Sequence, residues 1–116
     1  MERVDNKERV EFKGGGVRDS DAGRPRFDLL MPVVVPYGEQ LLTRIAAHMA
    51  KGADHYSPRN WERFGGVEEL ERCRASLSRH FMQYMTDADD GEDHAAAIYF
   101  NIMAIEYIKG KIRGDW

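Results

Sequence analysis

Groups that could bind a metal ion or a phosphate gather around position 90. Glu92, Asp93 and His94 follow one another, and Asn101 lies on the same face of a predicted helix as His94. Carboxylate oxygens together with water suit Mg²⁺. The acids also suit a structural role, because Asp90 and Asp93 have the spacing of an N-cap and an N3 residue, where carboxylates favour the helix dipole. Two interpretations stay open: metal or phosphate chemistry, and helix capping alone.

A second candidate site is a polar face on a predicted helix over residues 67–85. The polar side chains that recur there at helical spacing are Glu69, Arg72, Ser76, His80 and Gln83. Arg79 lies at the edge of this face. A face that only meets water is expected to carry more Lys and Glu than Ser, His and Gln. The pattern therefore predicts either the lining of a polar site or a solvated surface.

Aromatic and cationic residues between positions 51 and 61 could bind a nucleotide. Tyr56 and Trp61 flank Arg59 and Asn60. Aromatic rings stack on bases, and Arg with Asn can bond phosphate or base edges. Trp61 could equally close the end of a helical bundle. The cations that could bind a polyphosphate, or only solubilise the surface, are Lys51, Arg59, Arg72 and Arg79.

Other chemistries find less support. No two histidines form an i,i+4 pair and Cys73 has no second cysteine, so the pattern speaks against zinc. Asp93 and His94 reverse the order of the His-Asp motif of metal-dependent phosphohydrolases. A serine nucleophile would need a strained turn, whereas Ser76 and Ser78 are on a predicted helix.

The elements that must position these groups are three helices after residue 36. The first runs from about residue 41 to Lys51, and Gly52 is its predicted C-terminal stop. The second covers 67–85, and its apolar stripe consists of Leu70, Cys73, Leu77, Phe81 and Tyr84. The third covers 95–108 and is apolar nearly all round, as expected of a helix buried on several sides.

Residues 1–35 are predicted to form a flexible or extended N-terminal arm. Gly14–Gly16 is interpreted as a hinge, because no Gly-Lys-Ser/Thr follows to make a phosphate loop. The segment 24–30 is expected to be extended, since residues before a proline avoid the helical basin. No strand alternation is visible. The sequence predicts an all-α fold in which residues 36–116 form a bundle of three main helices that is completed by oligomerisation.

Composition narrows the class of protein. The chain has 116 residues, 42% hydrophobic and 32% charged, with a net charge of −3. This length suits one domain, and the charge speaks against a nucleic-acid binder. The longest aliphatic stretch is interrupted by Pro32, and the N-terminus lacks the apolar core of a signal peptide, so we expect no membrane partner. The single Cys73 favours a reducing cytoplasm.

Several motifs in the same order resemble one family. The strings are Lys51-Gly-Ala-Asp-His-Tyr-Ser-Pro-Arg-Asn-Trp-Glu62, Ser76-Leu-Ser-Arg-His80 with Gln83, and Gly91-Glu-Asp-His94 with Ala96, Ala97 and Asn101. The stretch Arg24–Leu29 resembles the N-terminal signature of the same family. Together the motifs resemble the phage-type dATP/dGTP diphosphohydrolase family, which is related to the MazG-like all-α nucleotide pyrophosphohydrolases.

The resemblance implies a homo-oligomer, a dimer or larger, that hydrolyses a deoxypurine nucleoside triphosphate to the monophosphate and pyrophosphate with Mg²⁺ or Mn²⁺, in the host cytoplasm if it is encoded by a phage. The expected metal ligands are Glu92, Asp93, Glu69 and Glu71. The expected catalytic residues are Glu92, Asp93, His80 and Arg79. The expected nucleotide-binding residues are Lys51, Tyr56, Arg59, Asn60, Trp61, Arg72, Ser76, Gln83, His94 and Asn101.

Two departures from the wider MazG-like pattern motivate other functions. That pattern has a Glu-Glu-x-x-Glu cluster on one helix, whereas the first helix here has only Glu39 nearby, and Thr43, Arg44 and Ala47 stand where relatives often place an acid. The alternative is therefore a protein of the same fold that sequesters a nucleotide or a nucleotide-derived signal without cleaving it. A third hypothesis is a structural helical oligomer without a ligand.

Overall fold

The computed structural model describes residues 9–116, which divide after Pro32 into two compact units. The sequence predicts the change from arm to helical domain at residue 36. The part of the first unit that the structure describes, 9–32, holds a small hairpin of β1 (Arg9–Glu11) and β2 (Val17–Asp19) and one 3₁₀ turn, η1 (Phe27–Leu30). The second unit, Val33–Trp116, carries the helices and the cavity described below.

The hairpin corrects two expectations about the arm. β1 and β2 pair antiparallel with Val10 opposite Arg18, although no strand was predicted. Gly14–Gly16 is the turn of this hairpin and not a hinge: Gly15 has φ +92°, and the N–H of Phe12 donates to the carbonyl of Gly16 at 2.7 Å. Glycine reaches this backbone conformation without a Cβ clash, which makes a tight turn possible. The strands are short and exposed on both faces, so alternation could not reveal them.

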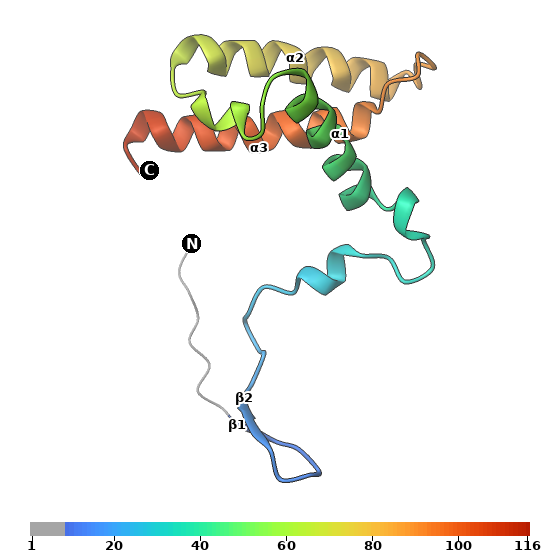
Figure 1. Ribbon diagram of the computed structural model, residues 1–116, viewed down its shortest axis with the longest axis vertical. Coiled ribbons are helices and arrows are strands. Elements are labelled where there is room, and N and C mark those ends of the chain that lie inside the picture. Colours follow the sequence, from blue (N-terminus) through green and yellow to red (C-terminus); the bar gives the residue numbers. More distant parts are fainter. Residues whose placement is uncertain (1–8) are drawn as a thin grey trace. The chain divides into compact units, whose positions relative to one another are not determined.

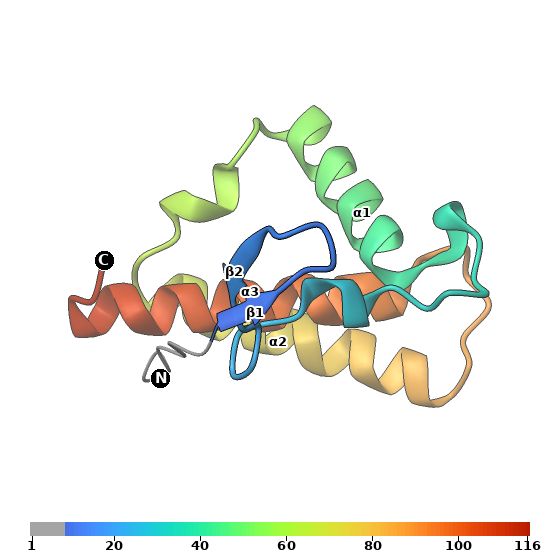
Figure 2. The ribbon, with the colours of Figure 1, turned by 90° about the horizontal axis from the view of Figure 1, so that it is seen from below.

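The second unit is mostly helical, as predicted. Its elements are η2 (Tyr37–Glu39), α1 (Leu41–His55), η3 (Asn60–Arg63), α2 (Val67–Met85) and α3 (His94–Arg113). Figure 1 shows α2 and α3 side by side, and α1 meets α3 at a steep angle before the chain returns through η3 (Figure 2). Among the described residues, no helix is both long enough and apolar enough to cross a membrane.

Local signals set most helix ends. The bounds predicted for α2 are confirmed, and its start is capped by Glu69, whose Oε2 accepts from the N–H of Gly66 at 3.0 Å. α3 is longer than predicted and ends at Arg113, followed by Gly114, whose φ of +84° suits a left-handed C-cap. Gly52 does not stop α1, which continues to His55. A glycine inside a helix costs only about 1 kcal/mol, and the tertiary structure tolerates it here.

The core lies between α2 and α3. It is formed by Leu70 and Cys73 from α2 with Ala104, Ile105 and Ile108 from α3. Half-buried rings and one aliphatic side chain cover this core: Trp61, Phe64, Leu77 and Phe100. Burial in this core raises the pKa of the Cys73 thiol.

The apolar stripe predicted along α2 holds for only part of the helix. Phe81 and Tyr84 are 49% and 51% exposed. In this half of α2 the polar face packs against α3 instead, because Ser76 and His80 meet hydrogen-bonding partners there. α3 is buried over much of its surface, including Ala97, Asn101, Ala104 and Ile108, but Tyr99 and Ile102 are exposed.

Candidate functional site

A cavity of about 700 Å³ lies among α1, η3, the middle of α2 and the start of α3. This volume is in the range of small-molecule sites. The residues predicted from the sequence that line it are Lys51, Tyr56, Arg59, Asn60, Trp61, His80, Glu92 and Asp93. Four segments that are distant in the sequence therefore contribute cations, rings and acids to one cavity.

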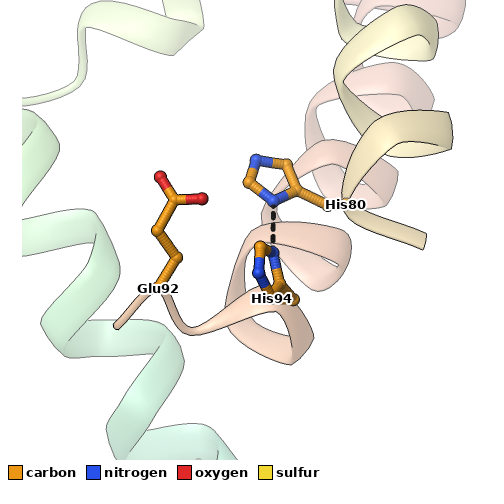
Figure 3. Close-up of side chains that lie close together, drawn as sticks. All are labelled: His80, Glu92 and His94. Atoms are coloured by element: carbon orange, nitrogen blue, oxygen red, sulfur yellow. Dashed lines mark hydrogen bonds between the residues drawn. The ribbon is translucent and has the colours of Figure 1, made fainter. Parts of the chain in front are cut away.

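His80, Glu92 and His94 lie close together at the edge of this cavity (Figure 3). His80 comes from α2, His94 from the first turn of α3, and Glu92 from the segment just before it. Each offers one ligand atom, and these three atoms lie within 4.8 Å of one another. The Nδ1 atoms of the two histidines are 2.9 Å apart. Among the described residues this is the one cluster of such side chains that could hold a metal ion.

Asp90 orients His94. The Nε2 atom of His94 lies 2.9 and 3.0 Å from the two carboxylate oxygens of Asp90, so Nε2 carries the proton and donates it. In a neutral His94 the lone pair is then on Nδ1, which faces His80. The backbone N–H of Glu92 also donates to Asp90 at 3.0 Å, and this bond is the main cause that lowers the pKa of Asp90. His94 is only 5% exposed, so its ring is held on all sides.

Partial burial lowers the pKa of His80, while the Glu92 carboxylate opposes the shift. A neutral imidazole is the form that can accept a hydrogen bond or bind a metal ion. The electrostatics of the cluster therefore favour the ligand form of His80 near neutral pH.

Asp93 has two structural partners. Arg44 of α1 donates to both of its oxygens, at 2.8 and 2.7 Å, and this contact is the main cause that lowers the pKa of Asp93. Asp93 is also the N-cap of α3, accepting from the N–H of Ala96 at 3.2 Å. Asp90, the N-cap expected from the spacing, lies before the helix. Asp93 thus joins α1 to the start of α3 at the cavity.

The other acids named from the sequence lie elsewhere. Glu69 caps α2, and Glu71 pairs with Arg74 at 3.0 Å on an exposed face. Glu69 precedes His80 by eleven positions, which corresponds to about 16 Å along a helix. Within one chain, Glu69 and Glu71 are therefore not brought together with Glu92 and Asp93.

The residues of the polar face of α2 fall into two groups, one that contacts α3 or the segment before it and one that is exposed. Ser76 accepts from Asn101 at 3.2 Å, and Gln83 donates to Asp90 at 3.3 Å, so both support the helix pair beside the cavity. Asn101 also donates to the carbonyl of Ala97 at 3.0 Å and is buried. Arg72 and Arg79 are exposed and do not line the cavity.

The segment between α1 and α2 brings two rings, Tyr56 and Trp61, and two polar side chains, Arg59 and Asn60, to the cavity. Arg59 adopts the left-handed conformation with φ 62° and pairs with Glu62 at 2.7 Å. The ring of Trp61 packs edge-on against Tyr107, with the ring centroids 5.1 Å apart, while it also lines the cavity. Trp61 therefore serves the core and the cavity at once, and both interpretations of this residue have a basis in the structure.

Several residues that line the cavity were not predicted from the sequence, among them Arg44, His48 and Phe100. Arg44 was noted only as standing where relatives place an acid, and its partner Asp93 is 49 positions away. His48 and Phe100 line the cavity, with their rings 5.7 Å apart. The signal that could have found His48 is its i,i+4 spacing from Arg44, which puts both on one face of α1.

The helices and the cavity define a small, mostly helical protein with a ligand-sized site lined by cations, rings and metal-ligating groups. Comparison with family models gives the family: residues 15–114 match the one described as dATP/dGTP diphosphohydrolase, N-terminal, and the chain belongs to it. The name points to a hydrolase, and the resemblance noted from the motifs is confirmed. No curated protein and no solved structure gives a significant match.

Proposed function

We propose that the protein hydrolyses a deoxypurine nucleoside triphosphate to the monophosphate and pyrophosphate. The observation that carries the proposal is the cavity, which brings together aromatic rings, cations, a carboxylate and an imidazole in a volume of about 700 Å³. The name of the family supports dATP and dGTP as the first substrates to test.

In this proposal the base stacks on Trp61 and Tyr56, and Asn60 bonds its edge. Lys51 and Arg59 neutralise the phosphates and stabilise the leaving pyrophosphate, because a developing negative charge is best met by cations already in place. Arg72 and Arg79, outside the cavity, are secondary candidates for the same task. Asp93 and Arg44 hold α1 against α3 and so keep the two walls of the site in position.

Mg²⁺ held by Glu69, Glu71, Glu92 and Asp93 does not fit the arrangement within one chain. Mg²⁺ demands oxygen ligands in octahedral geometry, whereas Glu69 and Glu71 are distant and both Asp93 oxygens accept from Arg44. Mg²⁺ therefore enters the proposal as the ion that accompanies the triphosphate substrate. Glu92 is the carboxylate of the cavity that no ion pair occupies among the described residues.

The second candidate is a protein that binds a nucleotide without cleaving it. The observation that favours it is the same separation of the acids, since a cavity can bind a triphosphate with cations and rings alone. Incubation with a panel of dNTPs and either Mg²⁺ or Mn²⁺, followed by chromatography, separates the candidates. Pyrophosphate release supports the hydrolase. Tight binding without turnover supports sequestration. If the protein neither binds nor cleaves a nucleotide, the hypothesis of a structural oligomer is supported.

We also propose that the protein is a homo-oligomer in a reducing cytoplasm. Large apolar side chains are exposed on one half of α2 and on α3: Phe81, Met82, Met85, Tyr99 and Ile102. Exposed apolar area of this kind is normally covered by a partner. Light scattering at micromolar concentration tests this directly, and a stable monomer of 13.3 kDa would contradict it.

A further inference from the structure

We propose that His80, Glu92 and His94 bind one divalent transition-metal ion, with Zn²⁺ and Co²⁺ as the probes. The sequence speaks against zinc because no histidine pair has i,i+4 spacing. The structure forms the pair in another way: His80 comes from α2 and His94 from α3, across the turn that joins them.

The ligand atoms are already near the spacing that a metal ion requires. Two nitrogens at about 2.1 Å from one ion lie about 3.4 Å apart in the tetrahedral geometry of zinc and about 3.0 Å apart in octahedral geometry. The Nδ1 atoms of His80 and His94 are 2.9 Å apart, and His80, Glu92 and His94 each offer one ligand atom within 4.8 Å of the other two. On metal binding the proton between the two nitrogens moves to Nε2 of His80, so both imidazoles stay neutral. The carboxylates of Glu92 and Asp90 then balance the two positive charges of the ion.

The residues around the ligands are arranged as supports. A metal-binding histidine normally donates its second N–H to a carboxylate, which fixes the ring and raises its basicity. Asp90 does this for His94 at 2.9 Å and also accepts from the backbone of Glu92 at 3.0 Å. Gln83 donates to the same carboxylate at 3.3 Å. One acid therefore positions two of the three ligands.

The donor set selects the kind of ion. Imidazole nitrogen suits Zn²⁺ and similar late first-row ions such as Co²⁺, whereas Mg²⁺ and Mn²⁺ prefer oxygen ligands. Two nitrogens and one carboxylate oxygen are also the ligand set of zinc sites that keep a fourth position open. His80 and Glu92 line the cavity, so an open position would face it. Binding of a phosphate oxygen of the nucleotide at that open position rests on the proposed function, whereas metal binding itself does not.

The test is a calorimetric titration of the metal-free, full-length protein with Zn²⁺ and with Mg²⁺, without nucleotide. We expect one Zn²⁺ per chain and at least tenfold weaker binding of Mg²⁺. Glu92→Gln and His80→Gln should each weaken Zn²⁺ binding at least tenfold, and Asp90→Asn by about 10- to 100-fold. Co²⁺ should give visible absorption bands that both ligand variants lose.

His55→Gln and Glu68→Gln are the matched controls, because they remove an exposed imidazole and an exposed carboxylate outside the cluster. Circular dichroism checks that each variant is folded, and Glu92 is exposed, so its replacement leaves the helices intact. No Zn²⁺ binding, equal Mg²⁺ binding, or an equal loss in the controls would overturn the proposal. Zn²⁺ binding by a protein that does not hydrolyse dNTPs would contradict only the proposed function.

Discussion

The two halves of the α2–α3 pair pack by different means. At one half, Leu70 and Cys73 meet Ile105 and Ile108 in the apolar core. At the other half, Ser76 meets Asn101 and His80 meets His94 through polar contacts beside the cavity. The difference indicates that the apolar half supplies most of the free energy of folding. The polar half buries less apolar surface and instead positions the side chains beside the cavity.

Ile108→Ala should produce the largest loss of stability. Ile108 is fully buried, and truncation of such a side chain costs about 2–5 kcal/mol, because the transfer free energy is lost and a cavity remains. Urea denaturation measures the free energy of unfolding. Ile112→Ala, on the same helix with a side chain 47% exposed, is the matched control and should change it little. Equal losses in the two variants would contradict a core confined to this half.

Asp93→Asn tests whether the polar half serves catalysis. Asn also caps helices well and the ion pair with Arg44 is partly exposed, so the free energy of unfolding should fall by less than about 1 kcal/mol. Turnover should fall about a hundredfold, equivalent to about 2.7 kcal/mol, because the wall of the site loses its anchor. Initial rates of pyrophosphate release measure this. Full activity with a lowered melting temperature would limit Asp93 to a structural role.

Asn101→Ala probes the polar contact between the helices. The buried amide donates to Ser76, and loss of such a bond costs about 1–3 kcal/mol. A double-mutant cycle with Ser76→Ala measures the share that belongs to this pair. Additive losses would show that Asn101 acts through packing or through Ala97 rather than through Ser76.

Glu71→Gln should have the smallest effect. Its ion pair with Arg74 is exposed, and pairs of this kind contribute about 0–1 kcal/mol. Because Glu71 is distant from the cavity within one chain, we expect dNTP turnover to stay within twofold. A large loss of activity at unchanged stability would instead indicate that a second copy of the chain brings Glu71 to the site.

Local patterns were enough to predict the helices. The stripe of Leu70, Cys73 and Leu77 predicts α2, because helix periodicity depends on residues within a few positions. The motif that contains Trp61 likewise pointed to the loop that lines the cavity. The hairpin at Gly15 escaped prediction, since its strands bury no face that would produce alternation.

By itself, the sequence determined the mostly helical class, the extent of α2, the family and several of the charged and aromatic groups at the cavity. Only the tertiary structure decided which face of α2 meets α3, that Asp93 pairs with Arg44, and that His80, Glu92 and His94 share one place. The physical reason is the separation along the sequence of the residues that interact. Helix periodicity and caps act over a few residues, whereas helix rotation and crossing depend on side chains up to 49 positions apart that meet only after folding.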